Sequence, residues 1–515
     1  MGFMRDGNTA RALPYPEPEF PDKGPKVSPS PAPEQPHHTV RLQRTDWVIA
    51  AVLTLSVGMA CLFIADMIPA FLLQSMDFWF ESDTVREVSN MTSTTDDHSR
   101  TSVHPLFSIL TFVPVYLVKH ALAIPPLQAV LYVTSILGGV WMGTLYLLLR
   151  LMGCRTLDAS VFTALGLSSA SAIFWLPVPN SYTWGSWSVM ISLALLLLAE
   201  QHRVGALPYV LASAFTLSIT VTNWMAGLLT TLARWPFKQA VQLSINAFCL
   251  VVLLWGAQKF IFPSAEFFIG SRKEANWINH PQSGQASNIA SSFAFHTLIA
   301  PAIRFIDDDG YIQVGDDSVR LAQRLAFQFS TPGSAGPLGL IAVCLWSALL
   351  LNGLWRLVTM DRQLRFRLVL ATLLLFELSL HMVYGEETFT YSLNFTPLLI
   401  ALAALGTLSP GRPAVLVLAG LLALCAGINN WQQFRQATES ATHFTPQRDA
   451  MNSLMQNDPD RPWPRSVGHI PLAVPGAPEA EHAYHEPGGD FSPQAPSFGV
   501  SLWLCDAEGR PLVTS

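Results

Sequence analysis

Charged residues are scarce in this chain of 515 residues: only 13% are Asp, Glu, Lys or Arg, while 50% are hydrophobic. A soluble domain carries about a quarter charged residues. Apolar runs long enough to cross a bilayer recur from about Val48 to Ala426, each near the length that a membrane-spanning helix needs. The composition therefore predicts an all-α polytopic membrane protein.

Several functional motifs are also missing. The six cysteines show no CxxC spacing, which argues against a disulfide framework or a cysteine metal cluster. No GxxxxGK[ST] occurs, and no GxGxxG follows a strand, so nothing indicates an ATP-driven pump or a dinucleotide enzyme. The basic residues are too scattered for a nucleic-acid surface, so we expect no nucleic-acid partner.

Three regions follow from the distribution of proline, charge and apolar runs. Residues 1–44 are Pro-rich and polar, which predicts a disordered tail. Lysines and arginines before the first apolar run place this tail in the cytoplasm, and the run itself predicts a retained anchor in a bacterial inner membrane. We expect residues 45–430 to form the transmembrane catalytic domain. Residues 431–515 predict a small periplasmic extension with one strand at 498–504.

About eleven membrane segments are expected. They begin with Asp46–Leu73 and continue at 127–150, 158–176, 184–200, 206–221, 223–235, 240–262, 337–357, 367–384, 391–408 and 412–428. The pair 206–235 is short enough to be a broken hairpin with its tip at 222–224. Residues 104–122 are apolar but short and Pro-rich. We expect them to be juxtamembrane or re-entrant, because the later basic clusters then all face inside.

The first outer loop, 79–126, concentrates charge directly after the first span. A carboxylate-rich loop at a membrane surface suggests binding or chemistry there. Glu81 and Asp83 lie two residues apart, so a turn can aim both at one point, and either can serve as a general base. The preceding run Phe78-Trp79-Phe80 is suited to the headgroup layer. Alternatively, both carboxylates only solvate the end of the span.

A basic cluster follows in the same loop. His98, Arg100 and His104 form H-x-R-x-x-x-H, and an arginine beside imidazoles can hold a phosphate or diphosphate. With Asp83 or Asp97, the histidines can alternatively hold a divalent metal ion. No other cofactor is expected. A histidine that caps a helix or is simply exposed is the structural alternative.

Further polar side chains are candidates for substrate binding. Asn180 and Tyr182 lie in the turn after the third span, in the sequence Pro-Val-Pro-Asn-Ser-Tyr. Glu386 and Glu387 precede a span in which Tyr391 and Asn394 share one helical face. These groups can hydrogen-bond a sugar, or they can be a polar stripe packed against a neighbouring helix. A large outer loop at 263–336 separates the two sets.

The pattern resembles the GT-C glycosyltransferases, which include protein O-mannosyltransferases and aminoarabinose transferases. The resemblance rests on Glu81-Ser-Asp83, on Arg100-Thr-Ser-Val-His104-Pro-Leu-Phe, on Pro179-Asn-Ser-Tyr182, and on Tyr384-Gly-Glu-Glu with Tyr391-Ser-Leu-Asn394. It implies a polyprenyl-phosphate-linked sugar donor, inversion at the anomeric carbon, and a lipid, glycan or protein acceptor. It also implies Asp83 or Glu81 as the base or metal-positioning residue. The adjacent Asp-Glu pair of the family is replaced here by Glu-Ser-Asp.

Two functions therefore compete. The first is an inverting membrane glycosyltransferase with its active face in the periplasm, where Arg100, His104 and His98 bind the donor phosphate. The alternative is a transporter or flippase of lipid-linked or polar substrates, which needs ionisable groups along a pathway through the membrane. Asp66 and Glu377 are the evident candidates for such groups. Another outer-face transferase, such as an acyltransferase or polymer ligase, is a third option.

Overall fold

The computed structural model describes residues 42–69, 73, 79–270, 278, 284–307, 311–314, 317–320 and 323–442. Within these residues the chain forms fifteen α-helices. Seven helical segments are long and apolar enough to cross a membrane, by length and composition. The expected helical class is confirmed, and these seven segments are candidate membrane spans, while eleven crossings stay a prediction. The expected tail lies outside the described residues except for its last three positions, and so does the strand at 498–504.

The seven long apolar segments are α1 (Arg44–Ala65), α4 (Pro126–Leu151), α7 (Ser181–Gln201), α10 (Phe237–Ile261), α12 (Pro337–Thr359), the run of η6 (Thr388–Tyr391), α14 (Ser392–Ala404) and η7 (Leu405–Leu408), and α15 (Arg412–Thr442). The other helices are α2 (Thr84–Thr92), η2 (Ser99–Ser102), α3 (Phe107–Leu122), α5 (Thr156–Leu167), α6 (Ala170–Trp175), α8 (Ala206–Ile219), α9 (Trp224–Arg234), α11 (Ala286–Ser291), η5 (Ser292–His296) and α13 (Leu364–His381).

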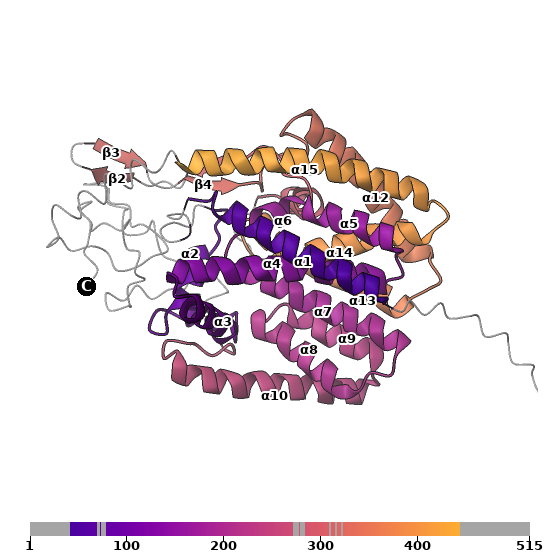
Figure 1. Cartoon of the computed structure of the whole chain (residues 1–515), viewed down its shortest axis with the longest axis horizontal. Helices are drawn as coiled ribbons and strands as arrows, with labels where there is room; N and C mark the ends of the chain where they lie inside the picture. The colour runs from indigo at the N-terminus through magenta and orange to yellow at the C-terminus, as the bar shows by residue number, and fades with distance from the viewer. Residues whose placement is uncertain are drawn as a thin grey trace, which may run out of the picture. The chain divides into compact units, whose positions relative to one another are not determined.

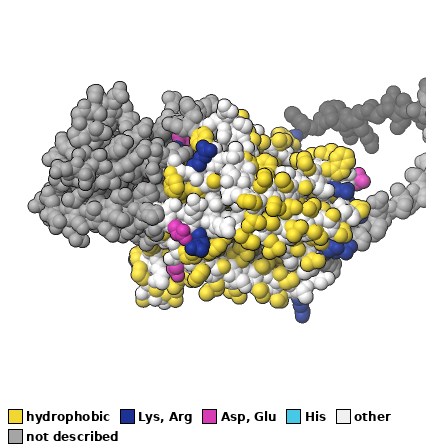
Figure 2. Space-filling view, turned by 90° about the horizontal axis from the view of Figure 1, so that it is seen from above, with side chains coloured by type: hydrophobic (Ala, Val, Ile, Leu, Met, Phe, Trp, Pro, Cys, Tyr) yellow, Lys and Arg dark blue, Asp and Glu magenta, His cyan; other side chains and the backbone are white. Residues whose placement is uncertain are grey.

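Most of these helices run side by side in one bundle (Figure 1). Small residues let the backbones approach closely, as is common in membranes. A Cβ atom at Gly139 of α4 would overlap the carbonyl oxygen of Thr54 in α1. Ion pairs fix one end of the bundle: Arg150 Nε lies 2.7 Å from Asp46 Oδ1, and Arg412 Nη2 lies 2.6 Å from Asp158 Oδ1. Figure 2 shows an apolar surface along the bundle, with most of the charged side chains toward its ends.

Helix α3 differs from the rest in direction. Figure 1 shows it almost end-on, while the bundle helices are seen from the side, so it lies across the bundle. Its apolar face packs through Phe107 and Val115 against Val88 and Met91 of α2 and against the start of α4. The juxtamembrane or re-entrant location of 104–122 stays a prediction.

Three segment boundaries were predicted wrongly. Helix α1 ends at Ala65 rather than at Leu73, and Asp66 caps its end three residues before Pro69. The segment 158–176 is interrupted between α5 and α6, where the Ser169 hydroxyl accepts a hydrogen bond from the Ala172 N–H. Helix α15 continues to Thr442 instead of ending at 428. The predicted broken hairpin at 206–235 is confirmed as α8 and α9.

The described part of the large loop at 263–336 contains four short β-strands. Strands β1 (Arg304–Asp307) and β4 (Gln323–Ala326) pair antiparallel with Arg304 opposite Ala326, and β2 (Tyr311–Val314) pairs antiparallel with β3 (Asp317–Arg320). Two two-stranded sheets therefore supplement the expected all-α architecture. Strand β4 matters for the site, because it carries Arg324.

Candidate functional site

Helix α2 presents Asp83 at its amino end. Asp83 is the N-cap residue, and its carbonyl accepts the first helical hydrogen bond from Glu87 N–H at 2.9 Å. A capping aspartate normally also accepts a bond from a first-turn N–H, worth about 1 kcal/mol. Here the carboxylate makes no such bond. It pairs instead with Arg86, one turn on, and lies 3.8 Å from Arg100 Nη2. The side chain is thus oriented by two guanidinium groups.

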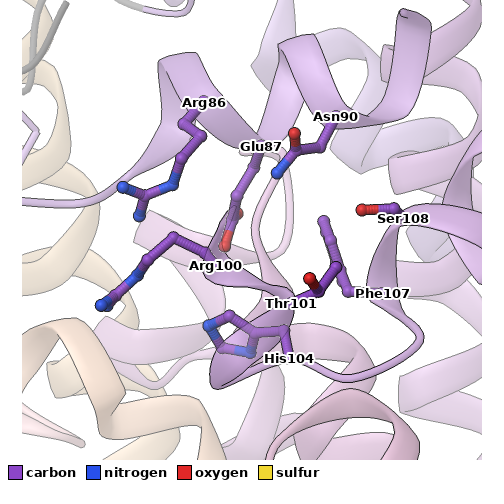
Figure 3. Close-up of a pocket in the computed structure, with 8 residues that line it drawn as sticks. All are labelled: Arg86, Glu87, Asn90, Arg100, Thr101, His104, Phe107 and Ser108. Atoms are coloured by element: carbon purple, nitrogen blue, oxygen red, sulfur yellow. The ribbon is translucent and has the colours of Figure 1, made fainter. Parts of the chain in front are cut away.

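Beside this cluster lies a hollow of about 250 Å³ that is partly open to solvent, which we call the first hollow. Its walls come from α2, η2 and the start of α3, and consist of Arg86, Glu87, Asn90, Arg100, Thr101, His104, Phe107 and Ser108. Figure 3 shows Arg86, Glu87 and Asn90 extending from one helix, with Arg100, Thr101 and His104 on the other side. The structure thus brings together the predicted residues Asp83, Arg100 and His104.

The His104 ring has a defined tautomer. Nδ1 lies 2.8 Å from the carbonyl oxygen of Ile219, which can only accept, so in the neutral ring Nδ1 donates its proton there. Nε2 therefore keeps its lone pair. Burial, with the Arg100 charge, lowers the pKa of His104 to about 4. At neutral pH the ring is uncharged, and it can accept a hydrogen bond through Nε2.

The pKa values of two carboxyl groups in this cluster shift in opposite directions. Burial favours the neutral form of Asp83, but the charges of Arg86 and Arg100 outweigh it and hold the pKa of Asp83 below its ordinary 3.8. Burial raises the pKa of Glu87 to about 8, and the nearby Asp83 charge adds to that rise. Two carboxyls with separated pKa values are a common sign of divided roles in catalysis. Asp83 is ionised at neutral pH, while Glu87 carries a proton.

Glu81 lies in a second hollow of about 200 Å³, lined by Glu81, Arg324, Leu325, Ala326, Gln328, Phe329, Glu386 and Glu387. Arg324 pairs with Glu81, and both of its terminal nitrogens donate to Glu386 Oε2 at 3.3 Å. Glu81 and Asp83 therefore do not point at one spot. Phe80 and Glu81 both have left-handed backbone, with φ of 54° and 53°. This unusual turn for non-glycine residues separates the two carboxylates.

Aromatic side chains hold that turn. Trp79 and Phe80 are 2% and 0% exposed, so the expected headgroup location is wrong for both. Phe78 lies outside the described residues. The aromatic cluster consists of Trp79, Phe80, Phe174, Trp175, Phe327, Phe389 and Phe434, with the ring of Phe80 4.8 Å from Phe327 and 5.1 Å from Phe389. The cluster joins the first outer loop to α6, to the end of β4 and to η6.

Two predicted binding residues have structural roles. Asn180 is the N-cap of α7: its Oδ1 accepts from Thr183 N–H at 2.7 Å, and its Nδ2 donates to the carbonyls of Trp175 and Val178. Glu387 accepts from the N–H groups of Phe327 and Gln328 at 3.2 and 3.1 Å. Burial raises the pKa of Glu387 to about 7, against the effect of these backbone donors. Both side chains fix the walls of the site.

Tyr182, Tyr391 and Asn394 form two separate contacts outside the hollows. The rings of Tyr182 and Tyr391 are 5.4 Å apart, and Tyr182 lies within electrostatic range of Glu87 and Asp83. Asn394 Oδ1 accepts from Asn223 Nδ2 at 3.4 Å, and the absence of a side chain at Gly185 leaves room for this pair. These residues are not among those that line the first hollow.

His98 is not part of the first hollow. Its Nδ1 lies 2.8 Å from Ser108 Oγ and its Nε2 lies 3.1 Å from the Ser93 carbonyl, and the ring is fully buried. Asp97 accepts from the N–H and hydroxyl of Ser99. The donors proposed for a metal ion therefore do not converge, and among the described residues no group of three or more His, Cys, Asp or Glu side chains is arranged to hold one.

Sequence reasoning left Arg86, Glu87, Asn90 and Arg324 out of the site. The first three could have been predicted from the sequence, because together with Asp83 they recur at three- and four-residue spacing on one helical face. Nothing in the sequence pattern predicts Arg324, since it reaches Glu81 from a strand far away along the chain. The chain matches no protein-family model and no curated protein sequence.

Proposed function

We propose that the chain is an inverting membrane glycosyltransferase that moves a sugar from a polyprenyl-phosphate donor to an acceptor hydroxyl on the periplasmic face of a bacterial inner membrane. One observation carries the proposal. An ionised carboxylate, Asp83, is held by two arginines beside a neutral histidine at the edge of a hollow. That arrangement combines a base with an anion-binding group.

The donor fits the surroundings of the first hollow. Arg86 and Arg100 suit the single negative charge of a phosphodiester, whereas the neutral His104 ring can only accept at Nε2 and so does not bond to the phosphate oxygens. Helix α3, which borders the hollow, exposes Val113, Tyr116 and Leu117 by 47%, 48% and 61%. An apolar surface of this kind suits the polyprenyl chain. The phosphate and the lipid are thus accommodated by adjacent parts of α2, η2 and α3.

Donor binding also prepares the base. In the free protein the Asp83 carboxylate is paired with Arg86 and Arg100. A phosphate that takes over these guanidinium groups leaves Asp83 with fewer partners and raises its affinity for a proton. Asp83 then accepts the proton of the acceptor hydroxyl as its oxygen bonds to the anomeric carbon. The bond from that carbon to the phosphate oxygen breaks, and polyprenyl phosphate leaves with the electron pair.

The acceptor enters from the side of the second hollow. Glu81 and Glu386 are held there by Arg324, and the Glu387 carboxyl forms the floor through its backbone bonds. Carboxylates can orient the hydroxyl groups of a glycan, lipid headgroup or protein side chain. Glu81 remains the alternative base, since it is the carboxylate on the acceptor side of the turn.

The test is release of polyprenyl phosphate from a panel of polyprenyl-phosphate sugars by the purified protein. Asp83→Asn should reduce transfer by about 10²- to 10⁴-fold, the usual contribution of a general base, while the protein still binds donor. Asp97→Asn is the matched control, because Asp97 lies in the same loop but bonds only to Ser99 in its described contacts. Full activity of Asp83→Asn would sink the assignment, and loss only in Glu81→Gln would transfer the role to Glu81.

The second candidate function is transport, and one feature of helix α13 favours it. Glu377 and His381 lie one turn apart on α13, 3.8 Å apart and buried, with the His381 ring 4.9 Å from Tyr391. Buried ionisable pairs inside a bundle are typical of transport pathways. Reconstituted vesicles distinguish the two. Transport of a lipid-linked sugar across the bilayer without release of lipid phosphate, abolished in Glu377→Gln, would favour the transporter.

A further inference from the structure

The His104 ring presents a hydrogen-bond acceptor to the first hollow. Its Nδ1 proton is directed at the Ile219 carbonyl oxygen, 2.8 Å away, with the Thr220 hydroxyl oxygen at 3.2 Å. Both partners lie at the end of α8, so the ring is oriented by an element other than those that carry the two arginines. Figure 3 shows the other ring nitrogen on the same side as the guanidinium groups of Arg86 and Arg100. One hollow therefore combines two cations with an unprotonated ring nitrogen.

These groups make different demands on a phosphate. The guanidinium groups donate to the oxygens of any phosphate. The lone pair at His104 Nε2 needs a partner that carries a hydrogen. A phosphodiester carries none at neutral pH, so its anionic oxygens and Nε2 are two acceptors. A phosphate monoester can hold one, because its second pKa is about 6. That proton, on the phosphate oxygen or on Nε2, joins the two groups in a charge-assisted hydrogen bond.

The charges around His104 permit this shared proton. Arg86 and Arg100 lower the affinity of the ring for a proton, whereas Asp83 raises it. Glu87, the other ionisable residue in the wall, is protonated at neutral pH, and the α8 side contributes only a carbonyl and a hydroxyl. The second negative charge of a monoester offsets the guanidinium charges and favours a proton between ring and phosphate.

We infer that His104 makes the first hollow selective for phosphate monoesters over diesters, through one proton shared between Nε2 and a phosphate oxygen. The inference rests on the proposed function, in which the donor is a diester and the released polyprenyl phosphate is a monoester. The product should therefore bind more tightly than the donor and compete with it for Arg86 and Arg100. His104 is then the residue that distinguishes the two lipid phosphates.

The experiment measures the binding of two ligands to the full chain in a nonionic detergent by calorimetry. One is farnesyl phosphate, a monoester, and the other is its methyl ester, a diester with the same apolar chain. At about pH 7.5 the unmodified protein should bind the monoester roughly ten- to hundredfold more tightly, as one charge-assisted hydrogen bond predicts. The free monoester is mostly a dianion at this pH, so its binding should also take up about one proton. Heats measured in two buffers of different ionisation enthalpy reveal that uptake.

Two variants assign the effect to the ring. His104→Gln offers a donor to either ester, so the ratio of the two Kd values should fall close to one and the proton uptake should be lost. His120→Gln is the matched control, because His120 is exposed on α3, bonds to the Tyr116 carbonyl and does not line the hollow. It should keep both the preference and the uptake. The ratio within one preparation does not depend on the folded fraction.

The outcomes separate this inference from the proposed function. Equal binding of the two esters by the unmodified protein, or an unchanged ratio in His104→Gln, overturns the inference while sugar transfer continues. Inorganic phosphate should bind weakly, because it cannot contact the exposed apolar side chains of α3. If it binds as tightly as farnesyl phosphate, the assignment to a lipid product is wrong. If neither ester binds, the inference fails together with the donor site, and the release assay decides the proposed function by itself.

Discussion

The buried carboxyl of Glu87 predicts an unusual dependence of stability on pH. Burial raises its pKa from 4.5 to about 8 in the folded protein. Below pH 4.5 the folded and unfolded states are both protonated, and the folded state has its full advantage. As pH rises from 4.5 to 8, the unfolded state releases the proton and the folded state does not, so stability falls. Above 8 both are ionised and the loss is complete.

The size of this effect follows from the pKa difference. Each pKa unit corresponds to about 1.36 kcal/mol, so the rise from 4.5 to about 8 amounts to about 5 kcal/mol over the whole range. Between pH 6 and pH 8 the folded state loses about 2 kcal/mol, because the folded carboxyl is half ionised at pH 8. Glu87→Gln has no proton to hold and should lose this contribution. At about 2 °C per kcal/mol, the Tm of Glu87→Gln minus that of the unmodified protein should be on the order of 5 °C larger at pH 8 than at pH 6.

Thermal unfolding of the detergent-solubilised protein, followed by tryptophan fluorescence between pH 5 and pH 9, measures the difference between variants. Other groups also titrate in this range, so the comparison is between the slopes of Tm against pH. Glu439→Gln serves as control, because the Glu439 side chain is 64% exposed. If Glu87→Gln and the unmodified protein show the same slope, Glu87 is not a buried neutral acid.

Three other outcomes are expected. Phe80→Ala should lower the free energy of unfolding by about 3–5 kcal/mol, because a fully buried ring in the aromatic cluster is lost, and chemical denaturation measures it. Arg324→Gln should destabilise the second hollow by leaving Glu81 and Glu386 facing each other, and adding Glu386→Gln should recover part of the Tm. Asn180→Ala should cost about 1–2 kcal/mol through loss of the α7 cap. Asn180→Asp should also lower the Tm, because it keeps the cap acceptor but loses the two donors to the carbonyls of Trp175 and Val178, as thermal melts will show.

The segments of the fold were largely predictable, because long apolar runs bounded by proline or charge have few alternatives. The expected segments 240–262 and 337–357 differ by at most three residues from α10 and α12. The errors have distant causes. The segment predicted at 412–428 ends before Asn429 and Asn430, which donate to the carbonyls of Ala300, Ser168 and Leu298. These bonds bury both amides inside α15, and they are visible only once α5, η5 and α15 are assembled.

The candidate site was predictable in part for the same reason. Asp83, Arg100 and His104 come from one loop, so local sequence placed them together. His98 has the same residue type and a similar position, but Ser108 and Ser93 occupy both of its ring nitrogens. Glu81 was paired with Asp83 on spacing alone. Its actual partner, Arg324, comes from β4, and the left-handed backbone at Phe80 and Glu81 has no sequence signature such as glycine.

The position of the aromatic cluster has one more consequence. The turn at Phe80 and Glu81 separates the two hollows, and the Thr390 hydroxyl bonds to the Phe80 carbonyl at its centre. Glu81 and Asp83 are two residues apart, so a shift of the backbone at Glu81 also moves the backbone at Asp83. A ligand that displaces this turn at one hollow therefore changes the wall of the other, through a segment only a few residues long.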